Sequence, residues 1–352
     1  MTWVRKTTLA GLLIGLSLAG CGTAARPAAD PRPAAGQRPH AAAATEPRAR
    51  RAVTPPLQAL VTAQTEDRLL VADLPSGRVV RSITVPGSPG YVDASAGVIV
   101  VVSAAPGAVT LLNRGTMRTL TVIHGFTSPH IPAISPDGRF AYVTDDGSGE
   151  LTAISLAGHR VTSRVQVGAG AHHLAFAPDE RQVWVALSQS ARTITVLGTA
   201  SRSGRVDLGH PRVIGHFQPG YLAHDLLFSP GGDRVWITSA DTSYVGVFST
   251  RTRRLLFRVP VGAPPQHLAF SGGYAYLTSG YGSVIEQVSL ASGRVLRRTF
   301  APYGSFDLDT GGGYVVTASL LRGTLAIYNQ GLRLLHIRQL APSTEDVALT
   351  RP

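Results

Sequence analysis

The chain of 352 residues contains a single cysteine and a single lysine. Because Cys21 is alone, no disulfide can form within the chain. Because Lys6 is the only lysine, every other basic side chain is an arginine. The sequence also lacks Gly-x-Ser-x-Gly, a phosphate-binding loop and His-Glu-x-x-His. Without these motifs, nothing in the sequence supports a serine hydrolase, a nucleotide-binding enzyme or a zinc protease of those classes.

Residues 1–21 have the pattern of a secretory signal peptide, with Arg5 and Lys6 before an apolar run that starts at Leu9. The run is about ten residues long, too short to cross a bilayer, which needs about twenty. It ends in Leu18-Ala-Gly-Cys21, which resembles the lipobox of bacterial lipoproteins. That resemblance implies cleavage before Cys21, a diacylglycerol on its thiol, and an extracytoplasmic protein anchored to the bacterial membrane. The alternative is an ordinary secretory peptide with a chance cysteine.

Residues 22–56 contain 12 alanines and 7 prolines, and Val53 is their only large apolar residue. Such a segment buries too little apolar surface to offset its ordering entropy, so we expect a disordered tether. Arg48, Arg50 and Arg51 either contact anionic headgroups near the anchor or keep the tether solvated. The remaining chain has a net charge of only +6, which does not indicate a nucleic-acid partner.

One sequence unit recurs seven times between residues 57 and 352, with a period of about forty residues. Each unit has an arginine that opens a short apolar run: Arg78, Arg118, Arg160, Arg212, Arg254, Arg294 and Arg333. Eleven or twelve residues later comes a landmark position: Gly90, His130, His172, His224, Gln266, Ser305 and Glu345. A β-rich run follows most landmarks. A fixed period of this length with several short strands predicts a propeller.

Each unit is interpreted as four antiparallel strands, exemplified by segments that start at His172, Gln182, Thr193 and Arg212. The repeats begin near Gln58 with a second strand that has no first strand before it, and they end at Glu345 with a first strand that has no second strand after it. The two ends of the repeat region should therefore complete one blade. The longest spacing, between His172 and His224, places an insertion at residues 198–211. The predicted fold is therefore all-β, a seven-bladed β-propeller closed by the C-terminal strand, and a monomer.

The segments Tyr142-Val-Thr-Asp145 and Ser135-Pro-Asp-Gly138, with strands ending in Val167-Gly168, resemble the YVTN-repeat seven-bladed β-propellers. Members of that family are mostly exported or surface proteins. Related propellers include lactonases, streptogramin lyases, haem-carrying cytochrome domains and copper enzymes. The resemblance implies the fold and no single function.

The landmark position should lie beside the mouth of the central channel, where three adjacent blades carry His130, His172 and His224. Three converging imidazoles have the ligand chemistry of a zinc or copper site, which is the less favoured of two interpretations. The alternative is that each histidine ties one blade to the next through hydrogen bonds to the backbone. The next position adds His173, Asp225, His267 and Asp346. Asp145, Asp146 and Glu150 form an acidic cluster at a turn on the same face, interpreted as solvated and as a less favoured cation site.

Two functions follow. The first is a binding or scaffold module that takes a protein, a glycan or a small molecule on its loop face. The alternative is a metal-dependent enzyme, lactonase- or lyase-like, that uses the histidines. Such an enzyme needs a general acid or base near its metal, and only Glu345, Asp225 and Asp346 offer one. This scarcity of carboxylates favours the binding module.

Overall fold

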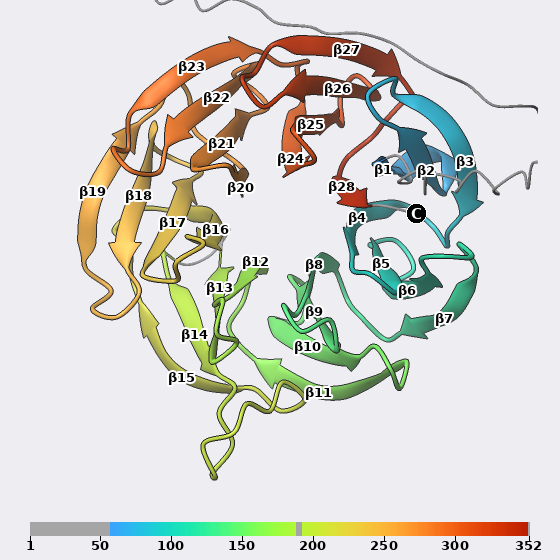
Figure 1. The fold of residues 1–352 in the computed structure, drawn as a ribbon. Coiled ribbons are helices and arrows are strands. Elements are labelled where there is room, and N and C mark those ends of the chain that lie inside the picture. Colours follow the sequence, from blue (N-terminus) through green and yellow to red (C-terminus); the bar gives the residue numbers. More distant parts are fainter. Residues whose placement is uncertain (1–56, 188–191, 351–352) are drawn as a thin grey trace, which may run out of the picture. The chain divides into compact units, whose positions relative to one another are not determined.

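The structure is a computed structural model that describes residues 57–187 and 192–350. The predicted signal peptide, Cys21 and the tether lie outside the described residues. Seven sheets of four antiparallel strands stand in a ring (Figure 1), which confirms the predicted seven-bladed β-propeller. Apart from a 3-10 turn at Gln64–Glu66 (η1), every element in the described part is a strand. No helix in this part is long and apolar enough to cross a bilayer.

In each blade the four strands follow one another from the channel outward. The first blade contains β28 (Val347–Thr350), β1 (Gln58–Ala63), β2 (Arg68–Asp73) and β3 (Arg78–Thr84). The second and third contain β4 (Pro89–Ala94), β5 (Val98–Ser103), β6 (Ala108–Asn113), β7 (Thr119–His124), then β8 (Pro129–Ile134), β9 (Phe140–Asp145), β10 (Glu150–Ser155) and β11 (Arg160–Gln166).

The other four blades follow the same order. The fourth and fifth contain β12 (Ala171–Phe176), β13 (Gln182–Leu187), β14 (Ile194–Gly198), β15 (Arg212–Phe217), then β16 (Ala223–Phe228), β17 (Arg234–Ser239), β18 (Tyr244–Ser249) and β19 (Leu255–Pro260). The sixth and seventh contain β20 (Leu268–Ser271), β21 (Tyr274–Ser279), β22 (Val284–Ser289), β23 (Val295–Phe300), then β24 (Ser305–Gly311), β25 (Tyr314–Ser319), β26 (Thr324–Asn329) and β27 (Leu334–Gln339).

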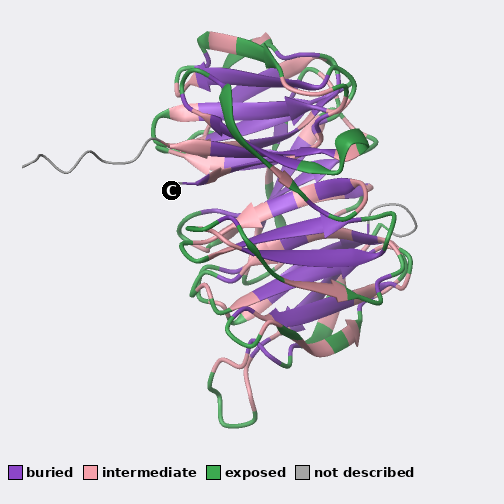
Figure 2. Ribbon diagram, turned by 90° about the vertical axis from the view of Figure 1, so that its right-hand side faces the viewer, coloured by how far each residue is buried: buried purple, intermediate pink, exposed green. Residues whose placement is uncertain are grey.

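The core of the domain lies between adjacent blades. The second and third strands of each blade are nearly continuous apolar runs and are buried on both faces, as Figure 2 shows. Trp184 of β13, for example, packs in one cluster with Ile237 of β17 in the next blade. Each blade therefore buries its faces only against its neighbours, so an open array would expose two apolar faces.

The two ends of the described chain close the ring as predicted. Strand β28 pairs antiparallel with β1, where Val61 lies opposite Val347 and Gln58 opposite Thr350. The insertion also lies where the repeat spacing placed it, between the end of β14 and the start of β15, and it projects from the ring in Figure 1.

The strand directions define two faces of the ring. First strands begin on one face, which we call the mouth face, and the turns between second and third strands lie there too. The opposite face carries the turns between first and second strands and those between third and fourth strands. Three of the first-to-second turns are closed by a hydrogen bond from the N–H of the fourth residue to the carbonyl of the first, in Ser135–Gly138, Ala177–Glu180 and Ser229–Gly232. In the first of these, Ser135 donates its hydroxyl to Asp137 and Gly138 has φ +70.

Candidate functional site

Two consecutive positions at the start of the inner strands face the central channel. In a regular strand, neighbouring side chains point to opposite faces of the sheet. Strand β12 has a bulge between Ala171 and His173, so His172 is an extra residue with no partner on β13. Bulges re-aim side chains in this way. As a result the rings of His172 and His173 meet edge to face, with centroids 4.7 Å apart.

The first of these positions forms a ring of side chains at the mouth, which we call the first ring. Its members are Glu345, Gly90, His130, His172, His224, Gln266 and Phe306. The structure therefore corrects the seventh landmark, which the sequence spacing placed at Ser305. Ser305 pairs with Ser319 of β25, just as Ala223 pairs with Ser239, so Ser305 precedes the ring by one residue.

A repeated hydrogen bond between blades supports this register. Threonine hydroxyls near the ends of second strands donate to the backbone carbonyl of the first-ring residue in the next blade. The pairs are Thr62 with Gly90, Thr144 with His172, Thr238 with Gln266, and Thr278 with Phe306. One interpretation of the sequence was that the histidine side chains form the hydrogen bonds between blades. In these four blade pairs the hydrogen bond instead joins a threonine hydroxyl to the backbone carbonyl of the first-ring residue. The imidazoles remain available for other contacts.

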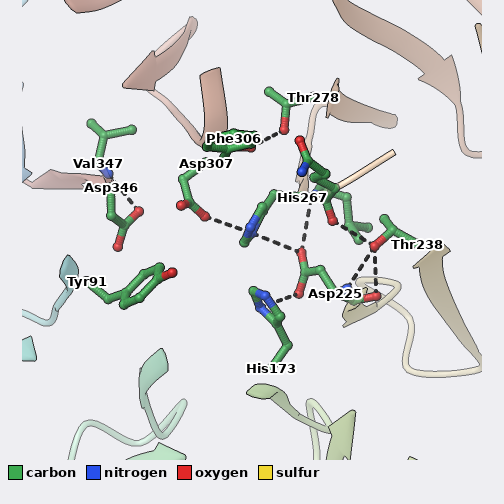
Figure 3. Close-up of polar contacts among 12 residues, drawn as sticks. Tyr91, His173, Asp225, Thr238, His267, Thr278, Phe306, Asp307, Asp346 and Val347 are labelled. Carbon is green, nitrogen blue, oxygen red and sulfur yellow. Dashed lines mark hydrogen bonds and ion pairs between the residues drawn. The ribbon is translucent and has the colours of Figure 1, made fainter. Parts of the chain in front are cut away.

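The next position forms a second ring, one layer deeper in the channel. Its members are Asp346, Tyr91, Ile131, His173, Asp225, His267 and Asp307. Figure 3 shows Asp225 between two imidazoles. Its Oδ1 lies 3.5 Å from Nδ1 of His173, and its Oδ2 lies 3.8 Å from Nδ1 of His267. Asp307 approaches His267 more closely, with 2.7 Å between Oδ1 and Nδ1.

Five imidazoles from the two rings form one cluster. Within it, two groups of three bring their ligand atoms within 4.8 Å of one another: His130, His172 and His173 form one, and His173, His224 and His267 form the other. The predicted trio is divided between these groups, because His224 lies in the second. His173 belongs to both groups and is therefore the centre of the cluster.

Hydrogen bonds outside the cluster orient two of the imidazoles. The hydroxyl of Tyr91 lies 2.8 Å from Nε2 of His130, whose Nδ1 is buried and has no hydrogen-bond partner among the described residues. Nδ1 of His172 lies 2.9 Å from Oδ2 of Asp146. Asp146 belongs to the turn that the sequence suggested was solvated. Instead, it positions a histidine at the mouth.

Its neighbour Asp145 has a structural role and is fully buried. The Asp145 carboxylate accepts hydrogen bonds from four backbone N–H groups, those of Thr127, Ser128, Gly147 and Ser148. It thereby fixes the connection between the second and third blades together with the turn that carries Asp146. The interpretation of this turn as solvated was wrong, since one carboxylate is buried and the other binds His172.

Burial keeps the imidazoles in the form that binds metals. Desolvation lowers the pKa of His130, His173, His224 and His267 below the ordinary value of 6.5, and for His130, His173 and His224 the neighbouring imidazoles add to the effect. These four rings are therefore neutral near pH 7, with lone pairs available for a cation.

Burial also raises the pKa of the carboxyl groups that share the channel. It raises the pKa of Asp225 to about 6, of Glu345 to about 7 and of Asp307 to about 8. The pKa of Asp346 is raised as well, by burial first and then by the charge of Asp307. The histidines thus belong to four adjacent blades, the third to the sixth, and Asp225 lies among them. Asp307, Glu345 and Asp346 belong to the seventh and first blades, and Asp307 contacts His267.

Some of these carboxylates also join neighbouring blades. Oδ2 of Asp225 accepts the N–H of Leu268, and Oδ2 of Asp346 accepts the N–H of Val92, both on the inner strand of the next blade. Asp93 and Asp309 do the same farther along the channel. Asp307 has no such backbone partner among the described contacts, and of these channel carboxyl groups it makes the shortest contact with an imidazole.

The cluster lies between two hollows. On one side a cavity of about 390 Å³ occupies the channel and is lined by second-ring side chains, among them His173, Asp225 and Asp307. On the mouth face a pocket of about 380 Å³ is lined by His224 and Gln266 of the first ring and by Tyr281. A small ligand or ion can therefore approach the histidine cluster from either hollow.

Sequence reasoning identified most of these residues but missed Asp307, Tyr91 and the role of Asp146. Asp307 was missed because the seventh landmark was placed one residue early. With Phe306 as the landmark, Asp307 falls at the same position as Asp225 and Asp346. The equal separation of 28 residues between each threonine and its first-ring carbonyl was the signal that could have corrected the register.

Comparisons with known proteins define the fold only. Neither a family model nor a curated protein matches the sequence. A functionally unknown protein from Desulfotomaculum acetoxidans is similar over 84% of this chain and 99% of its own, with 15% identity and a TM-score of 0.71. Hydrazine synthase from Kuenenia stuttgartiensis covers 77% and 91% at 15% identity (TM-score 0.64). Apo AztD from Citrobacter koseri covers 85% and 98% at 10% identity (TM-score 0.64). All three similarities define a β-propeller.

Proposed function

We propose that this β-propeller is an extracytoplasmic binding module, tethered to the membrane by a lipid on Cys21, whose channel binds a transition-metal ion such as zinc or copper. The solved relatives do not select a function, because one is described as functionally unknown and another as a synthase. The proposal therefore rests on the site itself.

One observation carries the metal site: five imidazoles meet in the channel, and His173 belongs to two groups of three. Neutral imidazole nitrogens are ligands for both zinc and copper. The buried Nδ1 of His130 has no hydrogen-bond partner in the described part of the chain, and an ion would give this nitrogen a partner. The contacts of Asp146 with His172 and of Asp307 with His267 are those of outer-shell partners that orient ligating histidines.

Calorimetric titration of the chelator-treated protein with zinc and with copper tests this proposal. We expect saturable binding of at least one ion by the wild type. The His124→Ala variant should bind equally well, because His124 lies exposed on an outer strand. An absence of heat and of retained metal with both ions would retire the metal site.

The lipid anchor rests on Leu18-Ala-Gly-Cys21. We expect the mature protein to carry an acylated Cys21 and to sediment with membranes, and the Cys21→Ala form to be released or left unprocessed. Mass spectrometry of the mature N-terminus checks this, and an unmodified Cys21 there would contradict the anchor. The outcome is independent of metal binding.

A metal-dependent lactonase or lyase is the second candidate. It is favoured by Glu345 and Asp307, because carboxyl groups whose pKa lies near 7 and 8 can exchange protons at neutral pH. A bound ion would polarise a substrate carbonyl, while these groups would supply or accept a proton. Lactone-opening assays on the metal-loaded protein, with Asp307→Asn as the comparison, distinguish an enzyme from a binding module.

A further inference from the structure

Both ends of the described propeller lie on the face opposite the channel mouth. In the first blade Gln58 of β1 pairs with Thr350 of β28 and with Asp73 of β2, and Asp73 pairs with Arg78 of β3. These four residues form one row across the blade. The chain therefore enters and leaves the propeller on the face of the first-to-second and third-to-fourth turns.

That face collects most of the arginines of the propeller, and we call it the arginine face. Fifteen arginines lie in its turns or directly beside them: Arg78, Arg114, Arg118, Arg139, Arg160, Arg181, Arg202, Arg205, Arg212, Arg234, Arg251, Arg253, Arg254, Arg294 and Arg333. Only six acidic residues share these positions: Asp73, Asp137, Asp179, Glu180, Asp207 and Asp233. The arginine face therefore has a surplus of nine positive charges.

The mouth face has the opposite balance. Its second-to-third turns carry three arginines (Arg68, Arg192 and Arg322) against six acidic residues (Glu66, Asp67, Asp145, Asp146, Glu150 and Asp241). The small net charge of the repeats thus hides a strong asymmetry between the two faces. The asymmetry arises because the repeated arginine always opens the fourth strand, and every fourth strand begins on the same face.

The arginine face is largely free to meet a partner. Twelve of its fifteen arginines are exposed, and only Arg139 and Arg234 form an ion pair with a described residue. The outer strands also place exposed aliphatic side chains two residues after the opening arginine. Examples are Ile214 at 52%, Leu256 at 50% and Leu296 at 53% exposure. A rim of guanidinium groups next to exposed aliphatic side chains has the composition of surfaces that bind at a lipid interface.

We propose that the arginine face docks on anionic lipid headgroups and so turns the channel mouth away from the bilayer. Charge complementarity favours this partner, because anionic headgroups attract arginines that lie close to the membrane surface. The position of the chain entry agrees, because the segment that leads from Cys21 joins the propeller on this face. A lipid anchor would raise the local concentration of the face at the membrane, but the docking itself needs neither the lipid nor a metal.

The test uses residues 21–352 with Cys21→Ser, which is the chain that lipobox processing leaves, without its lipid. Sedimentation is measured with vesicles of phosphatidylcholine alone and of phosphatidylcholine mixed with phosphatidylglycerol. We expect binding to the anionic vesicles, none to the neutral ones, and loss of binding at high salt, since the Debye length falls to about 3 Å at 1 M.

A triple variant, Arg254→Gln, Arg294→Gln and Arg333→Gln, removes three exposed guanidinium groups from three consecutive blades of the arginine face. It should weaken partitioning on the order of 10- to 100-fold. The matched control, Arg68→Gln, Arg81→Gln and Arg322→Gln, removes the same charge from exposed positions away from that face. It should change partitioning by less than about threefold, because distant charges are screened.

Three outcomes would overturn the proposal. Equal effects of the two triple variants would overturn it, because equal weakening would mean that net charge alone governs binding, and unchanged binding would assign it to the arginines before residue 57. Equal binding to neutral and anionic vesicles would exclude headgroup charge as the cause. Preferential binding of a soluble acidic polysaccharide over anionic vesicles would assign the face to a different polyanion. Failure of Cys21 acylation would not bear on any of these results.

Discussion

Nδ1 of His267 lies 2.7 Å from Oδ1 of Asp307, and the two residues belong to neighbouring blades. Both side chains are nearly fully buried. Burial lowers the pKa of the imidazole and raises the pKa of the carboxyl group to about 8, so each favours its neutral form. A protonated carboxyl group that donates to a neutral imidazole satisfies both.

This pair predicts an unusual dependence of stability on pH for Asp307. The folded protein keeps the Asp307 proton up to about pH 8, whereas the unfolded chain releases it near 3.8. The stability that the neutral carboxyl group provides at low pH is therefore lost progressively as pH rises between about 4 and 8. Asp307→Asn cannot titrate, and its amide can still donate to His267.

Thermal unfolding of wild type and Asp307→Asn at several pH values checks this. The melting temperature of the variant minus that of the wild type should increase steadily with pH across the window. Asp179→Asn, a change at an exposed turn residue, is the control and should show no such trend. A difference that stays constant with pH would mean that Asp307 is ionised in the folded protein.

The second prediction concerns the histidines. Because His173 belongs to both three-histidine groups, His173→Ala should weaken zinc or copper binding by about 100-fold or more. His130→Ala leaves the group of His173, His224 and His267 complete and should weaken binding by less than about tenfold.

From the repeat register alone, replacing His172 is expected to weaken metal binding more than replacing His267. The structure instead predicts similar effects, since each belongs to one group. Calorimetry on the four variants decides, and equal losses for His130→Ala and His173→Ala would contradict the shared centre.

The third prediction is that metal binding releases protons. A cation beside Asp307 and Glu345, whose pKa values lie at about 8 and 7, favours their ionised forms. At pH 7 the binding heat should therefore depend on the ionisation enthalpy of the buffer, and this dependence should vanish above about pH 9. The lowered histidine pKa values also mean that binding should persist below pH 6.5, where free imidazoles would already be charged. A buffer-independent heat at pH 7 would show that the carboxyl groups do not respond to the ion.

The fourth prediction concerns ring closure. Deleting residues from Glu345 onward removes β28 and the Asp346 carboxylate that accepts the N–H of Val92. It also exposes the apolar faces that β28 covers, so the truncated protein should aggregate or lose cooperative unfolding. Deleting residues 22–50 should leave the melting temperature almost unchanged. Similar melting temperatures for the two deletions would show that the closing strand is dispensable.

The sequence by itself determined the architecture. Seven recurrences of one unit fixed the number of blades, and the incomplete units at Gln58 and Glu345 fixed the closure, because each blade buries its faces only against its neighbours. The opening arginines also determine the charge asymmetry of the two faces, because they occupy the same position in all seven units. Their gathering on one face became visible only once the strand directions were known.

Only the tertiary structure decided the make-up of the site. In a regular strand His172 and His173 would point apart, but the bulge in β12 turns both toward the channel and makes His173 a member of both three-histidine groups. The contact of Asp307 with His267 depends on a one-residue register that the spacing of the last blades misplaced. The repeats were identified from side chains that recur in every unit, such as the opening arginine, whereas the site consists of side chains that differ from blade to blade. Where those side chains point depends on a backbone bulge at the start of the inner strands, which recurs in five blades but is not visible in the pattern of side chains.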